Sequence, residues 1–192
     1  MSNKPQTPSK NENGFTLVEA VIAIFIVTIA LIGTAGAITY ALEYSTLSKN
    51  STNAKLVITS MIEQVESLRN TRRLQFRQIA NVGSVDNTGV TINFTGFTTG
   101  FNEVSLNPGP DGVNGTTDDL INPGPDFIYG NGDDFTDPSY ARSGFTREVL
   151  ITDLSVFVKK VEVKVRYQAA AGKVGTLTGV CYLNNDSRLS QQ

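Results

Sequence analysis

The sequence predicts an α+β fold, in which the outer half of a long N-terminal helix packs on an antiparallel sheet of about four strands. Three features of the 192-residue chain support this class. Residues 20–42 contain no Asp, Glu, Lys or Arg, a helix-spaced apolar stripe follows them, and segments of alternating apolar and polar residues fill the C-terminal part. With 40% hydrophobic residues, the chain fits one anchor helix and one soluble domain.

Residues 1–14 are polar and include two prolines, so we expect a leader with little structure. The uncharged run after it would span roughly 30 Å as a helix, the thickness of a bilayer's hydrocarbon core. Lys4 and Lys10 precede this run, which predicts a cytoplasmic N-terminus and a C-terminal domain outside the membrane. A secretory signal peptide is the alternative, but its apolar region is usually about 7–15 residues long and ends at a cleavage site.

Glu19 is a single carboxylate one turn into this apolar segment. An acid at mid-bilayer costs about 2.5–3.5 kcal/mol on insertion scales, so we expect a partner group to relieve its charge. A plain anchor helix would need no such residue.

The stretch Gly14-Phe15-Thr16-Leu17-Val18-Glu19, set before a long apolar helix, resembles the class III prepilin signal of type IV pilins and type II secretion pseudopilins. The resemblance implies that a prepilin peptidase cuts between Gly14 and Phe15 and then methylates the amine of Phe15. It also implies that residues 15–42 form both the transmembrane segment and the core of a filament of pilin or pseudopilin subunits. Glu19 of one subunit could then pair with the Phe15 amine of a neighbour, since each charge is costly alone in an apolar bundle.

Residues 43–80 are expected to continue the helix as an amphipathic segment that ends near Phe76. Its apolar positions recur at spacings of three and four residues: Ala54, Val57, Ile58, Met61, Ile62, Val65 and Leu68. A half-exposed helix of this kind needs a sheet to cover its apolar stripe.

The remaining residues, 81–192, are predicted to form a β domain. We expect one or two strands between residues 82 and 106, including the alternating segment 90–94, and clearer strands at 145–154, 156–167 and 174–183. Basic residues of the second clear strand are expected on a solvated face of the sheet rather than at a DNA site: Lys159, Lys160, Lys164 and Arg166.

An acidic loop at residues 107–141 separates these strand regions and contains an internal repeat. The pattern N-P-G-P-D-x-x-x-G-x-x-D-D begins at Asn107 and again at Asn122, and the loop holds seven Asp and no Lys or Arg. A loop this long is usually functional or disordered. Ca²⁺ binds six to eight oxygens and would neutralise such a set of carboxylates.

The sequence therefore predicts that the loop binds one or two calcium ions through aspartates of both copies: Asp111, Asp118, Asp119, Asp126, Asp133 and Asp134. The loop is also similar to the Asp-rich calcium loop of major pseudopilins, with Asp111-Gly112 and Asp118-Asp119 at the matching positions. Its place differs, because strands follow it here. The alternative is a solvated acidic loop that binds no metal.

Composition argues against an enzyme. The chain has no His and one Cys, Cys181, so a cysteine nucleophile would lack an imidazole base, and no phosphate-binding or serine-based motif is present. Removing residues 1–14 takes away two lysines and one glutamate and leaves a net charge of −3, which gives no indication of nucleic-acid binding. The functional alternative to a filament subunit is a membrane-tethered, calcium-dependent binding or adhesin domain that does not polymerise.

Overall fold

The computed structural model describes residues 14–169 and 172–185, and these form two compact units that divide between Glu43 and Tyr44. Helix α1 (Leu17–Asn70) runs through both units. In the first unit it is a single helix with all its described side chains exposed, including Phe25 and Leu31. Its length and apolar composition are sufficient to cross a membrane.

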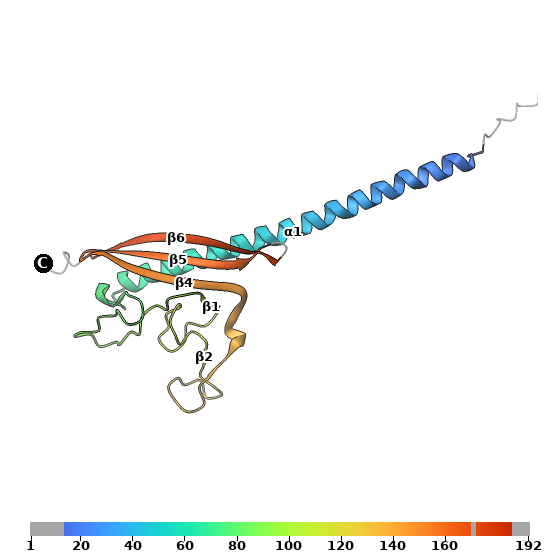
Figure 1. The fold of residues 1–192 in the computed structure, drawn as a ribbon. Helices are drawn as coiled ribbons and strands as arrows, with labels where there is room; N and C mark the ends of the chain where they lie inside the picture. Colours follow the sequence, from blue (N-terminus) through green and yellow to red (C-terminus); the bar gives the residue numbers. More distant parts are fainter. Residues whose placement is uncertain (1–13, 170–171, 186–192) are drawn as a thin grey trace, which may run out of the picture. The chain divides into compact units, whose positions relative to one another are not determined.

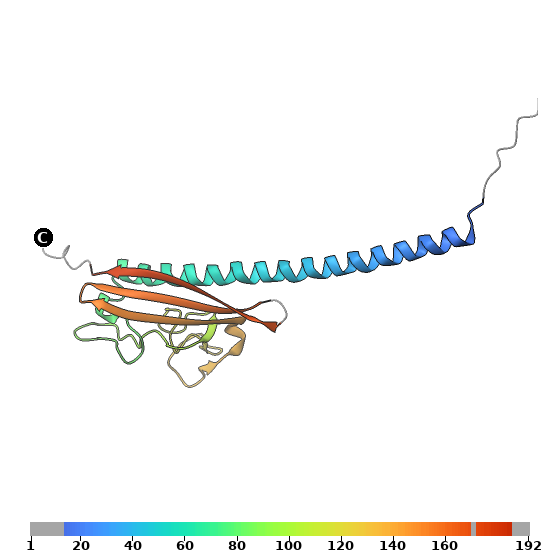
Figure 2. The ribbon, with the colours of Figure 1, turned by 45° about the horizontal axis from the view of Figure 1, so that its top comes forward.

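The second unit contains a four-stranded antiparallel sheet in the order β1-β4-β5-β6. The strands are β1 (Asn102–Ser105), β4 (Ala141–Ser155), β5 (Val158–Gln168) and β6 (Val174–Asn184). Residues 44–70 of α1 lie along this sheet, as Figures 1 and 2 show. The predicted α+β class, with a long helix and a four-stranded antiparallel sheet, is confirmed.

The core lies between the helix stripe and one face of the sheet. Six predicted positions of the stripe are buried: Ala54, Val57, Ile58, Met61, Val65 and Leu68. They pack in one cluster with alternate residues of β5, Val161, Val163 and Val165. A side chain at Gly179 of β6 would collide with Ile58, so this glycine allows the helix to approach the strand.

The opposite face of the sheet carries charged side chains. Lys164 lies 3.3 Å from Glu148 and 3.2 Å from Glu162, while Lys160 lies 2.6 Å from Glu162. The prediction for Lys159 is wrong, because this residue lies on the core face and its side chain is buried. The Lys159 ammonium is paired with Asp153 at 2.8 Å, which satisfies a charge that would otherwise be costly to bury.

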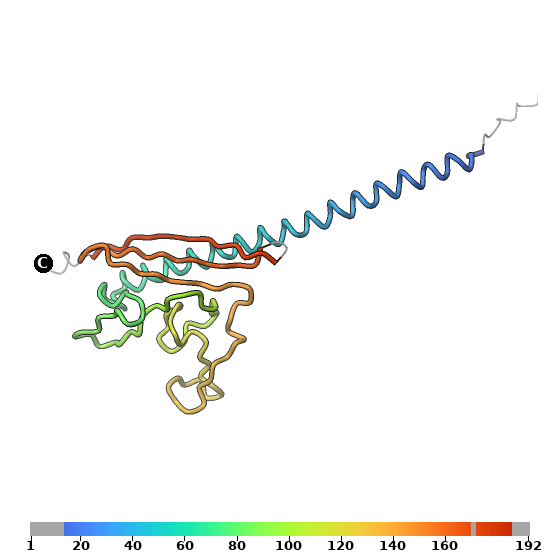
Figure 3. Tube along the Cα trace, viewed as in Figure 1, coloured from blue at the N-terminus to red at the C-terminus, as the bar shows by residue number. Residues whose placement is uncertain are grey.

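Helix α1 ends at Asn70, six residues before the predicted end. Arg72 adopts a left-handed conformation with φ 57°, which a continuing α-helix does not allow. A short 3₁₀ helix, η1 (Phe76–Gln78), follows instead. The trace in Figure 3 shows the turns that then lead to β1.

The strand predicted at residues 90–94 is also not observed. The Asn87 side chain accepts a hydrogen bond from the Phe94 amide (3.2 Å) and donates one to the Phe94 carbonyl (2.9 Å). Gln78 donates to the Ile92 carbonyl at 2.8 Å. Because side chains occupy these backbone groups, the segment forms a loop despite its alternating sequence.

Between β1 and β4 the acidic loop contains short regular elements: β2 (Ile121–Asn122), β3 (Phe135–Thr136) and the 3₁₀ helix η2 (Pro138–Tyr140). Strands β2 and β3 pair with each other as a separate two-stranded sheet. The second copy of the repeat therefore forms the connection between two paired strands.

Candidate functional site

The N-terminal candidate residues lie at the start of α1. Gly14 and Phe15 precede the helix, and Phe15 is 82% exposed. Thr16 and Glu19 form a reciprocal pair: the Glu19 amide donates to Thr16 Oγ1 at 3.3 Å, and the Thr16 amide donates to Glu19 Oε2 at 3.1 Å. This capping box satisfies two backbone donors that the first helical turn leaves without partners.

Sequence reasoning found Glu19 but not its local partner. The spacing T-x-x-E at Thr16 and Glu19 is itself a capping signal and could have identified it. Within the described chain, Glu19 Oε1 accepts no hydrogen bond. Glu19 can therefore cap its own helix and still offer one oxygen to a cation from another molecule.

The duplicated sequence of the acidic loop forms a duplicated structure. In the first copy, Asn107 Oδ1 accepts from the Gly109 amide at 3.1 Å, and Asp111 Oδ1 accepts from Val113 at 2.7 Å. The second copy repeats both bonds fifteen residues later, at 3.0 Å and 2.9 Å. The final aspartates also correspond, because Asp119 and Asp134 each accept from a glycine amide, at 2.8 Å and 2.7 Å.

The two copies differ in their surroundings. In the first copy Asp119 is buried and forms an ion pair with the buried Arg147 of β4 at 3.0 Å. Burial raises the pKa of Asp119, whereas the amides of Gly115 and Thr116 and the Arg147 guanidinium act in the opposite direction. Arg73 Nη2 donates to the Asp111 carbonyl at 2.6 Å. The first copy is thus fixed to the domain by two arginines.

Asp111, Asp118 and Asp119 lie close enough to affect one another. Burial raises the pKa of Asp111 to about 6, and the charges of Asp118 and Asp119 act in the same direction. Asp118 accepts from the Asp111 amide at 3.1 Å and from the Thr116 hydroxyl at 2.5 Å. The first copy therefore brings its three predicted aspartates into one hydrogen-bonded network.

In the second copy, carboxylate oxygens remain without donors. Asp126 accepts from Ile128 and from Asn131, but the Asp133 carboxylate has no hydrogen-bond donor among the described residues. Asp134 Oδ1 is buried and has no hydrogen-bond partner in the described part of the chain. Nowhere in the described ranges do three or more His, Cys, Asp or Glu residues form a group that could hold a metal ion. Calcium binding remains a prediction.

Sequence reasoning missed Arg147. This residue occupies a core-facing position of β4 between Phe145 and Val149, both of which are buried. A cation in such an apolar row indicates a buried ion pair, and the nearby acidic loop was the evident source of its partner.

An apolar helix long enough to cross a membrane, followed by an α+β domain, fits a single-pass membrane protein. Residues 9–35 match the family model described as the prokaryotic N-terminal methylation motif. The chain therefore carries the signature of type IV pilins and pseudopilins. No curated protein and no solved structure matches the chain. The matched residues include all three N-terminal candidates, Gly14, Phe15 and Glu19, and they end before the β domain.

Proposed function

We propose that the chain is a structural subunit of a type IV pilus-like or type II secretion pseudopilus filament. The observation that carries this proposal is the methylation motif at residues 9–35, which overlaps the exposed apolar segment of α1 at residues 17–42, where Glu19 is the single carboxylate. Prepilin peptidase would cut between Gly14 and Phe15 at the cytoplasmic face. Before assembly the subunit would be a single-pass membrane protein whose β domain lies outside the cytoplasm.

Assembly would proceed by helix packing rather than by chemistry. In lipid the apolar side chains of residues 20–42 gain little from contact with each other beyond close packing, so charge pairing can set the axial position of each subunit. Cleavage at Gly14 would create a cationic amine on Phe15. Glu19 of a neighbour would accept from it, and the two groups would neutralise each other inside the bundle.

Two substitutions separate this role from helix capping. Glu19→Ala removes both the charge and the cap, whereas Glu19→Gln keeps an oxygen that can accept from the Thr16 amide and removes only the charge. If Glu19 pairs with an amine, both variants should insert in the membrane and both should fail to enter sheared filaments. Normal assembly of the glutamine variant would show that capping suffices and would contradict the proposed pairing.

The same assay distinguishes the alternative function. A tethered calcium-dependent binding domain would stay in the membrane fraction and form no filaments, and the glutamine variant would behave as the wild type.

A second proposal concerns the acidic loop: we infer that it binds Ca²⁺, one ion or two. Its support is chemical, because calcium prefers carboxylate and carbonyl oxygens and the second copy offers the Asp133 carboxylate and the buried Asp134 Oδ1. In the first copy, Asp111 and Asp118 would supply oxygens, while Asp119 is already neutralised by Arg147.

A further inference from the structure

The two copies of the repeat share an internal fold, but the second copy exposes much more apolar surface than the first. Val113 in the first copy is 1% exposed, whereas its counterpart Ile128 is 62% exposed. The neighbouring Phe127 is 83% exposed. The loop that carries Phe127 and Ile128 extends away from the four-stranded sheet in Figures 1 and 2.

The backbone at Phe127 is also unfavourable for its side chain. Its φ is 59°, while the matching residue of the first copy is Gly112, with φ 63°. A bulky residue in this region is rare, and its backbone is strained. A large aromatic side chain that is exposed, on a strained backbone, contributes little to the stability of this domain. We therefore expect it to contact another molecule.

The first copy shows what such a loop contacts when it is docked. Val113 enters the core, Arg73 binds the Asp111 carbonyl, and Arg147 pairs with Asp119. The second copy presents the same groups, an apolar tip beside aspartates, without an arginine or an apolar cavity. The second-copy loop is therefore expected to bind a groove that is partly apolar and carries exposed cationic side chains.

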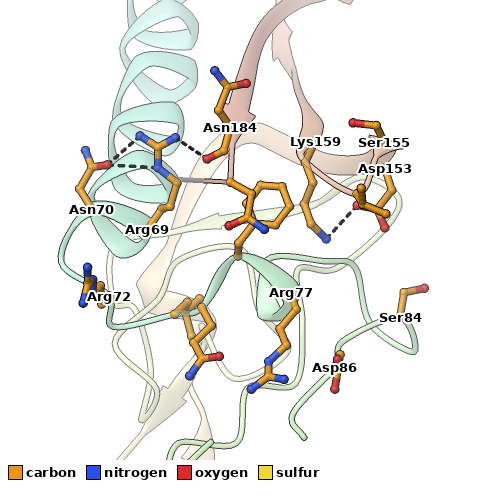
Figure 4. A pocket seen from close by; sticks show the side chains of 15 residues that line it. Arg69, Asn70, Arg72, Arg77, Ser84, Asp86, Asp153, Ser155, Lys159 and Asn184 are labelled. Carbon is orange, nitrogen blue, oxygen red and sulfur yellow. Dashed lines mark hydrogen bonds and ion pairs between the residues drawn. The ribbon is translucent and has the colours of Figure 1, made fainter. Parts of the chain in front are cut away.

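A groove with these properties lies in the same unit, at the end of α1. It has a volume of about 1130 Å³ and is lined by four basic and two acidic residues: Arg69, Arg72, Arg77, Lys159, Asp86 and Asp153. Leu74, Phe76 and Val156 add apolar surface. Figure 4 shows Arg69 and Lys159 bonded to neighbours. The guanidinium groups of Arg72 and Arg77 make no hydrogen bond or ion pair with any described residue.

We propose that the second-copy loop of one subunit, residues 122–136, docks into this groove of a second copy of the same chain. Charge complementarity selects this partner, because the loop has three aspartates and no basic residue, whereas the groove exposes Arg72 and Arg77. The contact joins two different surfaces of identical chains, and such heterologous contacts generate open helical polymers when the rotation does not close. This inference rests on the proposed function and adds a specific contact outside the membrane.

Cysteine crosslinking in the full-length chain tests the contact. In a Cys181→Ser background, Gly132→Cys in the loop combined with Ser84→Cys in the groove lining should give a ladder of dimers, trimers and longer species after treatment with a short bis-maleimide. Both positions are exposed, and the pair keeps Phe127, the aspartates and the arginines in place. The reaction is done in chelator, since a bound calcium ion would compete with arginine for the same carboxylates. Each single-cysteine chain should give no species beyond a dimer. The control pair replaces Ser84→Cys with Thr178→Cys, an exposed position on β6, and should give no ladder.

Charge reversal tests the same contact without relying on cysteine chemistry. Asp133→Lys and Arg77→Glu alter exposed side chains without hydrogen bonds in the described structure, so neither should unfold the domain. Each alone should lower filament yield severalfold, and the two combined should restore it. A combined variant that assembles no better than the single variants would overturn the proposal.

The experiments distinguish a failure of the loop–groove contact from a failure of the proposed filament function. Wild-type-like filaments without a crosslinked ladder, or with an equal ladder from the control pair, would overturn the loop–groove contact and leave the filament intact. A ladder in membranes of cells that form no filaments would support the contact and count against the filament.

Discussion

At the residue scale, Arg147 and Asp119 form an ion pair that is buried on both sides. Both side chains are at most 8% exposed. Removing one partner from a buried pair typically costs about 3–5 kcal/mol, because the other charge is left without compensation. Arg147→Ala should therefore lower the thermal midpoint of the full chain in detergent by many degrees.

Arg142→Ala is the matched control for this arginine. The Arg142 guanidinium carbon lies 5.0 Å from the centre of the Phe145 ring, and a cation–π contact of this kind contributes about 0.5–1 kcal/mol. Similar losses for both variants, measured by circular dichroism, would contradict the special role of the Arg147 pair.

Asp111 predicts a pH dependence of stability. Its pKa is about 6 in the folded chain, against 3.8 as the ordinary value, so between about pH 4 and pH 6 the folded state holds more protons than the unfolded state. Stability then falls as pH rises through this window. Asp111→Asn should make the melting temperature depend less on pH between pH 4 and pH 6. An unchanged slope in this variant would show that Asp111 is not responsible.

At the element scale, the calcium proposal is tested by the melting temperature of the full chain in calcium and in chelator. A ligand that binds only the folded state stabilises by about 2.7 kcal/mol at a hundredfold excess over its Kd. Asp118→Ala with Asp133→Ala should abolish the shift. Asp86→Ala with Glu103→Ala, two exposed carboxylates outside the loop, should retain it. Identical melting curves for the wild type in calcium and chelator would disprove the metal site.

The C-terminal strands could be predicted because their alternation has a simple cause. Val161, Val163 and Val165 face the helix while the residues between them face solvent, and this burial pattern is local to the strand. The segment 90–94 has the same alternation, but side chains distant in sequence, above all Gln78, hold its backbone. Such contacts depend on the folded chain and cannot be inferred from periodicity.

Candidate residues could be predicted where the type of residue is unusual for its surroundings in the sequence. Glu19 is conspicuous in an apolar run, and the two copies of the acidic repeat are visible by inspection. The difference between the copies was not predictable. Identical motifs become a docked loop and an exposed loop because Arg73 and Arg147 lie beside only the first of them.

At the scale of the whole molecule, two separate regions serve one proposed assembly. The apolar half of α1 would pack in the filament core, and the loop at residues 122–136 would add a contact between β domains. The motif and the membrane-length helix support the first region, and the groove at the end of α1 supports the second.

Processing at Gly14 is the step on which this assembly depends, since without it Phe15 has no free amine. Intact-mass and N-terminal analysis of the membrane-extracted chain, expressed in a host with active prepilin peptidase, measures it directly. We expect a chain that begins at N-methylated Phe15, and a Gly14→Asp variant that keeps its leader. A wild-type chain that still begins near Met1 in this host would show that the leader is not removed and that the proposed filament subunit does not form.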